Sequence, residues 1–343
     1  MIGLPAGFTG VIQDTASTAT LVALLSARER AGNGTRLTVY ASREGHSSID
    51  KGARLAGYGL ERLRHIPVDA AFALDPAALE RAIEADRAAG MIPACVVATI
   101  GSTSSTAIDP VEAIAAVCRR HGVWLHVDAA YAGSAAIVPE LRHHFAGMEQ
   151  ADSVVFNPHK WLMTNFDCTA YFVRDVDALL RTCSASPEYL RTAHDAQVVN
   201  YRDWGLQLGR RFRALKLWFV IRSYGVEGLR SLIRRHVALA AELKGWIESD
   251  PRFEVTAPVP FGLVCFRLRP AGRNDEEADR LNATLLARVN ASRRVHLTHT
   301  RLGGRYVIRL VVGQRETRRE HVEEGWRLVS AAADELATPL LSP

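Results

Sequence analysis

Two short motifs contain the residues of this chain that are best suited to covalent chemistry. One apolar run leads into Asp128 within His126-Val127-Asp128-Ala129-Ala130, and a second, Asp152–Phe156, ends just before Asn157-Pro158-His159-Lys160. A carboxylate and an amine at the C-terminal ends of neighbouring strands are the groups that pyridoxal phosphate (PLP) needs. The amine forms a Schiff base, and the carboxylate keeps the pyridine nitrogen protonated so that the ring accepts electrons. The sequence therefore predicts a PLP site centred on Lys160 and Asp128.

The choice of lysine is narrow, because the chain contains only four. Lys216 and Lys244 fall in strongly helical stretches, and Lys51 is expected in a helix beside Asp50. Lys160 follows a buried-strand pattern and stands between a histidine and a tryptophan. We therefore predict that Lys160 is the lysine that carries PLP.

Helical and strand patterns alternate from residue 10 to about residue 175, and these elements must position the two motifs. Near-continuous apolar runs indicate strands that are buried on both faces, and amphipathic segments between them indicate helices. We expect helices over residues 15–31, 47–57, 75–90 and 109–121, and strands over residues 37–41, 94–100, 123–127, 153–156 and 169–173. This order predicts an α/β fold with a mostly parallel, doubly wound sheet, whose ligands bind beyond the C-terminal strand ends.

The pattern changes in the last third of the chain. A long helical tract is expected from about residue 203 to residue 249, with a break near Tyr224-Gly225. Strands at residues 263–268 and 306–312 then alternate with helices at 276–290 and 315–333. We predict a large PLP-binding domain over residues 1–249 and a small α+β C-terminal domain over residues 250–343.

The composition is that of an ordinary globular protein. The chain has 343 residues, of which 48% are hydrophobic and 23% are charged. It contains no apolar run of membrane-spanning length and does not open on a signal peptide, so we predict a cytoplasmic protein that does not bind membranes. The net charge of +5 is scattered as arginine pairs, which favours solvated helix faces over nucleic-acid binding. The five cysteines lack metal-binding spacing and are predicted to be buried free thiols.

His126–Ala135 and Asn157–Trp161 resemble the motifs of group II PLP-dependent decarboxylases, specifically the aromatic-L-amino-acid decarboxylase branch. The resemblance extends from about residue 10 to about residue 336. It implies the PLP-dependent fold type I, which is aspartate-aminotransferase-like, and PLP as the cofactor. It also implies decarboxylation of an aromatic L-amino acid, such as DOPA, tryptophan, tyrosine or phenylalanine, to the amine and CO2. The expected assembly is a homodimer with the site at its interface.

The resemblance also assigns residues to the cofactor. His46 would stack on the pyridine ring, with Ala130 on the opposite face, and His159 would contact the phosphate or the substrate. From the residues alone, Thr15 or Ser17 could simply cap a helix, His46 could begin one, and Thr103 could satisfy loop backbone. The implied cofactor-binding residues are Ala16, Ser17, His46, Thr103, Asp128, Ala130, Asn157, His159 and Lys160.

Tyr189 lies in a polar stretch, residues 186–194, of a length and composition typical of a lid. The resemblance implies that Tyr189 returns a proton to the quinonoid carbon after decarboxylation, as a catalytic residue beside Lys160, Asp128 and His46. Relatives with phenylalanine there tend to give aldehydes, so Tyr189 favours the amine. Phe166, Leu208 and Gly209 are implied to line the substrate pocket.

Family members begin with a sizeable helical segment that entwines the dimer and supplies part of the pocket. This chain opens almost directly on Gly10–Gln13, which resembles the strand that leads into the phosphate-binding helix, so we expect that segment to be missing. Two alternatives therefore stand beside the decarboxylase. One is a decarboxylation-dependent aromatic aldehyde synthase, which Tyr189 and His46 disfavour. The other is a truncated PLP-binding chain without catalytic activity.

Overall fold

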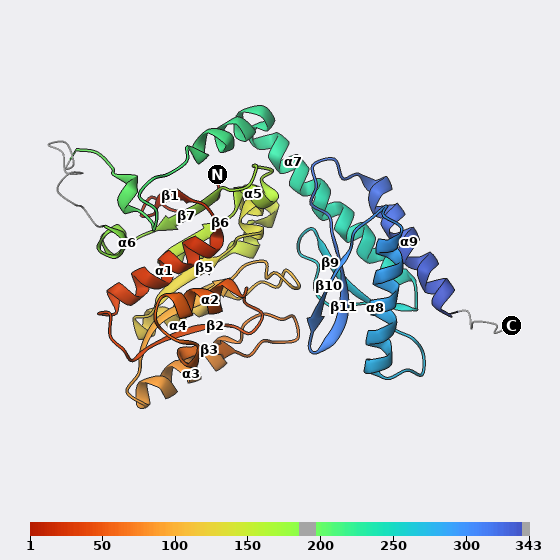
Figure 1. Cartoon of the computed structure of the whole chain (residues 1–343), viewed down its shortest axis with the longest axis horizontal. Coiled ribbons are helices and arrows are strands. Elements are labelled where there is room, and N and C mark those ends of the chain that lie inside the picture. The colour runs from red at the N-terminus through yellow and green to blue at the C-terminus, as the bar shows by residue number, and fades with distance from the viewer. Residues whose placement is uncertain (185–196, 338–343) are drawn as a thin grey trace. The chain divides into compact units, whose positions relative to one another are not determined.

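The computed structural model describes residues 1–184 and 197–337 (Figure 1). It separates into two compact units, Met1–Thr103 with Ile108–Arg230, and Ser104–Ala107 with Ser231–Pro343. The division falls inside a long helix, earlier in the chain than the boundary expected after residue 249. That domain boundary stays a prediction.

The first unit is built on a seven-stranded sheet. Its strands are β1 (Thr9–Gln13), β2 (Leu37–Ser42), β3 (Leu63–Ile66), β4 (Ile92–Thr99), β5 (Trp124–Asp128), β6 (Ser153–Phe156) and β7 (Thr169–Val173). They lie in the order β1-β7-β6-β5-β4-β2-β3. The strands from β6 to β3 pair in parallel. Strand β7 runs in the opposite direction and pairs antiparallel with both β6 and β1. The expected mostly parallel α/β sheet is confirmed; its antiparallel edge is a feature that burial patterns do not encode.

Helices cover this sheet. They are α1 (Ala16–Arg30), α2 (Ser48–Leu55), α3 (Pro76–Ala88), α4 (Val111–His121), α5 (Pro158–Trp161) and α6 (Val176–Cys183), with short 3₁₀ helices η1 (Leu60–Arg62), η2 (Ala132–Ile137), η3 (Pro139–Phe145), η4 (Met148–Gln150) and η6 (Tyr201–Asp203). Helix α1 packs along β4 to β7, and α3 and α4 pack on β4. Every residue of β2, β5 and β6 is buried, which requires cover on both faces of the sheet.

Local signals explain where these helices begin. Asp75 caps α3 by accepting hydrogen bonds from the backbone N–H groups of Ala77 and Ala78, and Pro76 occupies the first turn. Thr15 caps α1 through a hydrogen bond that its side chain accepts from the backbone N–H of Thr18. The predicted helices at residues 15–31 and 75–90 are confirmed within one or two residues of each end.

The second unit has a four-stranded antiparallel sheet in the order β10-β11-β9-β8. Its elements are β8 (Phe253–Val255), β9 (Leu263–Leu268), α8 (Asp275–Ala291), β10 (Thr298–Leu302), β11 (Arg305–Val311) and α9 (Arg319–Ala337). Helices α8 and α9 pack on each other, and α8 also packs on β9 and β11. Strands β8 and β10 were not predicted from the sequence, because β8 is short and β10 is mostly exposed and polar.

Helix α7 (Arg213–Ser249) corrects one expectation and confirms another. Its backbone is non-helical at Gly225, where the sequence predicted a break. It begins ten residues later than expected, because residues 204–212 make tertiary contacts instead: Gln13 Nε2 donates to the Trp204 carbonyl, and Arg210 to that of Ile12. No helix among the described residues is long and apolar enough to cross a membrane. All five cysteines are free, and only Cys183 is not buried.

Candidate active site

A cavity of about 230 Å³ opens in the first unit, where the C-terminal ends of β4, β5 and β6 meet the N-terminus of α1. It gathers all nine residues that were expected to contact the cofactor, from segments more than 140 residues apart in the chain. The lining residues are Thr15, Ala16, Ser17, His46, Ser48, Thr99, Gly101, Thr103, Asp128, Ala130, Tyr131, Asn157, His159, Lys160 and Phe166.

Lys160 and Asp128 reach this cavity from neighbouring strand ends. Asp128 ends β5 and is buried, and its Oδ1 accepts a hydrogen bond of 2.9 Å from the backbone N–H of Ala130. Lys160 lies on the one-turn helix α5 after β6, with its side chain open to the cavity. Desolvation lowers the pKa of Lys160, and the charge of Asp128 opposes that shift. A lowered pKa increases the share of neutral amine, the form that attacks a carbonyl.

The start of α1 offers an anion site at another wall of the cavity. Ala16 and Ser17 form the first turn, where free backbone N–H groups and the helix dipole favour a negatively charged group. Asn157 faces the same space from the end of β6, and its Oδ1 accepts a hydrogen bond of 2.7 Å from the Thr169 hydroxyl. With that oxygen engaged, the amide nitrogen is the group of Asn157 that can donate to a phosphate.

Two imidazoles complete the polar lining. The Nδ1 atom of His46 accepts a hydrogen bond from the backbone N–H of Ser48 and lies 2.7 Å from its hydroxyl oxygen. His159 Nδ1 accepts a hydrogen bond of 2.9 Å from the backbone N–H of Cys168, and its ring meets Phe166 edge-on at 4.8 Å. Desolvation is the largest cause that lowers the pKa of His159, so its ring is neutral at physiological pH.

Several lining residues were not singled out in the sequence. Gly101 has a φ of +81°, and a Cβ there would lie 2.6 Å from Ala132 Cβ, so this wall admits only glycine. Tyr131 stacks on Trp161 at 4.7 Å and 8°, and its position directly after Ala130 was the signal that could have identified it. Thr99 and Ser48 carry no such signal, because only the fold brings them to the cavity.

Of the three predicted substrate residues, only one lines the cavity. Phe166 lines the cavity and is 72% exposed. Leu208 and Gly209 lie in the segment before α7 and are not among the residues that line it. Tyr189 lies outside the described residues. The substrate roles of Phe166, Leu208 and Gly209 and the catalytic role of Tyr189 stay predictions.

The donor set fits PLP. A helix N-terminus suits the phosphate, a buried carboxylate suits the ring nitrogen, and an accessible amine suits the aldehyde. The small side chain of Ala130 on the cavity wall leaves room for a flat ring.

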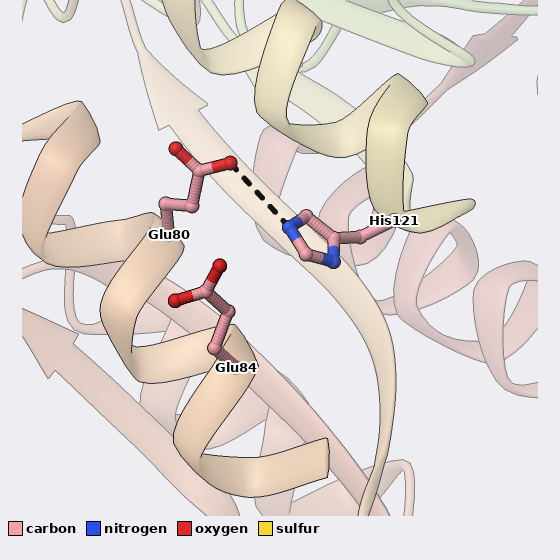
Figure 2. A group of neighbouring side chains, drawn as sticks. All are labelled: Glu80, Glu84 and His121. Atoms are coloured by element: carbon pink, nitrogen blue, oxygen red, sulfur yellow. Dashed lines mark ion pairs between the residues drawn. The ribbon is translucent and has the colours of Figure 1, made fainter. Parts of the chain in front are cut away.

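Figure 2 shows a second group of possible ligands outside this cavity, formed by Glu80 and Glu84 on α3 and His121 at the end of α4. His121 Nε2 lies 3.5 Å from Glu80 Oε1, and the Arg120 guanidinium lies 2.6 Å from the same oxygen. Hydrogen bonding from Arg120 is the largest cause that lowers the pKa of Glu80. Because the Arg120 guanidinium already pairs with Glu80, we assign the group no metal ion.

The α/β fold and the cavity define a PLP-dependent enzyme, and comparisons with known proteins specify the family. The model of the pyridoxal-dependent decarboxylase conserved domain matches residues 1–269. The chain is 45% identical to tryptophan decarboxylase TDC1 of Camptotheca acuminata, covering 98% of this chain and 70% of that protein. It is 43% identical to phenylacetaldehyde synthase of Arabidopsis thaliana, covering 95% and 69%. The crystal structure of Oryza sativa TDC with PLP and tryptamine superposes with a TM-score of 0.95 and 42% identity, covering 98% and 74%.

The chain therefore belongs to the pyridoxal-dependent decarboxylase family. It is a PLP-dependent amino-acid decarboxylase, a carboxy-lyase of fold type I, as the sequence motifs predicted.

Proposed function

We propose that this decarboxylase acts on an aromatic L-amino acid and converts it to the corresponding amine and CO2. The observation that carries the proposal is the cavity in which Lys160, Asp128 and the start of α1 converge. The aromatic class is supported by the names of the relatives and by the tryptamine in the similar crystal structure. Which aromatic side chain is preferred is a question for the assay below.

Different residues of the cavity would hold different parts of the cofactor. When bound, PLP supplies a carbonyl for covalent attachment and a sink for the electron pair released as CO2 departs. Lys160 would hold the cofactor covalently, and Asp128 would pair with its ring nitrogen. Ser17 and Asn157 would hold the phosphate, and the ring of His46 would pack on the cofactor plane. These groups are fixed on strand ends and helix starts, so little reorganisation is needed when substrate binds.

An aromatic substrate needs an apolar surface beside these polar groups. Phe166, in edge-on contact with His159, offers such a surface at the cavity. Leu208, Gly209 and Tyr189 are proposed to complete the substrate site and to protonate the product carbon, as the sequence motifs imply.

The proposal is tested with the purified chain, PLP, and separate incubations with L-tryptophan, L-tyrosine, L-DOPA and L-phenylalanine. We expect release of CO2 and formation of the amine for at least one of them, and none with D-tryptophan or in Lys160→Ala. An absorbance band of covalently bound PLP should appear in the wild type and be absent from Lys160→Ala. PLP binding without CO2 release from any substrate would contradict the proposal and favour a non-catalytic PLP-binding chain.

A second candidate is an aromatic aldehyde synthase, which the similarity to the Arabidopsis thaliana phenylacetaldehyde synthase supports. Such an enzyme releases an aldehyde together with ammonia and hydrogen peroxide in place of the amine. Measuring these products in the same incubations distinguishes the two reactions. The predicted role of Tyr189 favours the amine.

We also infer a homodimer. On α7, the large side chains of Leu215, Trp218 and Phe219 are 43%, 53% and 57% exposed. Their spacing of three and four residues places them on one face of the helix. Exposed apolar patches of this kind are typical of interaction sites, and a second copy of the chain is the occupant expected from the sequence.

A further inference from the structure

A buried histidine lies in the apolar core next to the active site. His126 is in the middle of β5, two residues before Asp128, and it is fully buried. Side chains two residues apart on a strand point to the same face of a sheet. His126 and Asp128 therefore share a face, and the ring of Tyr171 lies on it at 6.3 Å from that of His126.

Hydrogen bonds with Ser153 orient the imidazole of His126. Trp124 Nε1 donates a bond of 2.9 Å to the hydroxyl oxygen of Ser153, and His126 Nδ1 lies 2.9 Å from the same oxygen. The indole N–H can only donate, so Ser153 accepts from Trp124, and the single hydroxyl proton of Ser153 can go to His126 Nδ1 or to the Tyr171 hydroxyl. When it goes to His126, Nδ1 is an acceptor.

The remaining proton of the ring then lies on Nε2. Burial lowers the pKa of His126 to about 4, so the ring is neutral at physiological pH and carries one proton. With Nδ1 as the acceptor, this proton belongs to Nε2. Nε2 is buried and has no hydrogen-bond partner among the described residues. The charge that acts on the ring comes from Asp128.

We propose that His126 is a positioning residue for Asp128: the Trp124–Ser153 pair holds its Nε2–H toward the Asp128 carboxylate and fixes the orientation in which that carboxylate meets the cofactor nitrogen. A buried N–H without an acceptor is costly, and Asp128, on the same face of β5, is the charged group that acts on the ring. The inference rests on the proposed role of Asp128 at the cofactor, and it adds to that role three residues that do not line the cavity.

Two matched variants test the proposal through PLP affinity. His126→Gln places an amide donor close to the position of Nε2, whereas His126→Asn keeps a polar group near Nδ1 and removes the one at Nε2. We expect the apparent Kd for PLP to rise about tenfold in His126→Asn and to stay within about threefold of wild type in His126→Gln, since a hydrogen bond to a charged group contributes a tenfold effect or more. If His126 only fills the core and pairs with Ser153, the order of the two variants reverses, and the proposal is overturned.

The tautomer is a direct test on the unaltered chain. We expect ¹⁵N NMR of the PLP-free wild type to show the proton of His126 on Nε2, and the populations of the two tautomers to shift in Ser153→Ala. A proton on Nδ1 in the wild type would refute the proposal even if a variant failed to fold. Asp128→Asn separates the two levels of inference. If it leaves PLP affinity unchanged, the assigned role of Asp128 is wrong; if it weakens binding while His126→Asn does not, only the role of His126 is wrong.

Discussion

At the scale of single residues, Asp109 shows how one buried carboxylate supports a wall of the cavity. Its Oδ2 accepts a hydrogen bond of 2.7 Å from the backbone N–H of Thr99, which lines the cavity, and its Oδ1 accepts one of 2.8 Å from Leu74. Burial is the largest cause that raises the pKa of Asp109, to about 6, and the two backbone bonds oppose it. The end of β4 is thus held by a group that titrates near the physiological range.

This raised pKa predicts a pH-dependent contribution to stability. The folded state binds the proton of Asp109 more tightly than the unfolded chain, whose aspartates have a pKa of about 3.9. The contribution is therefore fully present below about pH 4 and is lost as the pH rises through about 6. Asp109→Asn lacks this contribution. Lowering the pH from 7.5 to 4.5 should therefore raise the free energy of unfolding of the wild type by about 2 kcal/mol relative to that of the variant. Denaturant unfolding at both pH values measures this gain, and parallel pH profiles would contradict it.

At the scale of elements, the site residues lie at the ends of strands and at the starts of helices. Asp128 is the last residue of β5, Asn157 directly follows β6, and Ser17 lies in the first turn of α1. Parallel strands bring their C-terminal ends to one edge of the sheet. The parallel order therefore brings Asp128 and Asn157 to the same edge of the sheet, at the cavity.

Helix α7 offers a clean test of backbone strain. Gly225 has φ 64° and ψ 171°, a conformation that is essentially restricted to glycine. A Cβ at Gly225 would meet nothing within 4 Å, so Gly225→Ala should destabilise the chain by about 1–3 kcal/mol through the backbone alone. Gly245 lies in regular helix in α7 and also has open space. Gly245→Ala is the matched control and should be neutral or stabilising by up to about 1 kcal/mol. Denaturation followed by circular dichroism measures both, and equal effects would show that the conformation at Gly225 is not strained.

At the scale of the whole molecule, the inferred homodimer makes a prediction for the exposed face of α7. Trp218→Glu introduces a charge into that apolar face, and burying an unpaired charge in an interface is costly. We expect light scattering after gel filtration to give a dimer for the wild type and a monomer for the variant. Leu55→Glu, at another exposed apolar residue, on α2, should leave the dimer intact. A wild-type chain that is monomeric at all concentrations would contradict the inferred assembly.

The order of the central strands and helices of the large sheet, and the placing of Asp128 and Lys160 at one edge of it, could be predicted from the sequence, because both depend on local patterns. Buried strands appear as apolar runs, and helix caps such as Asp75 act within a few residues of the chain. The motifs around Asp128 and Lys160 are equally compact, and the family comparison confirms the class of enzyme that they indicated.

Only the tertiary structure decided which side chains meet. The antiparallel direction of β7, the non-helical path of residues 204–212 and the presence of Thr99 and Ser48 in the cavity all depend on contacts between distant segments. The pairing of Ser153 with His126 depends on the register between β5 and β6. Hydrophobic periodicity indicates whether a residue is buried, because burial depends on the apolar area removed from water. It does not indicate which residues it contacts, because those depend on how the strands and helices pack together.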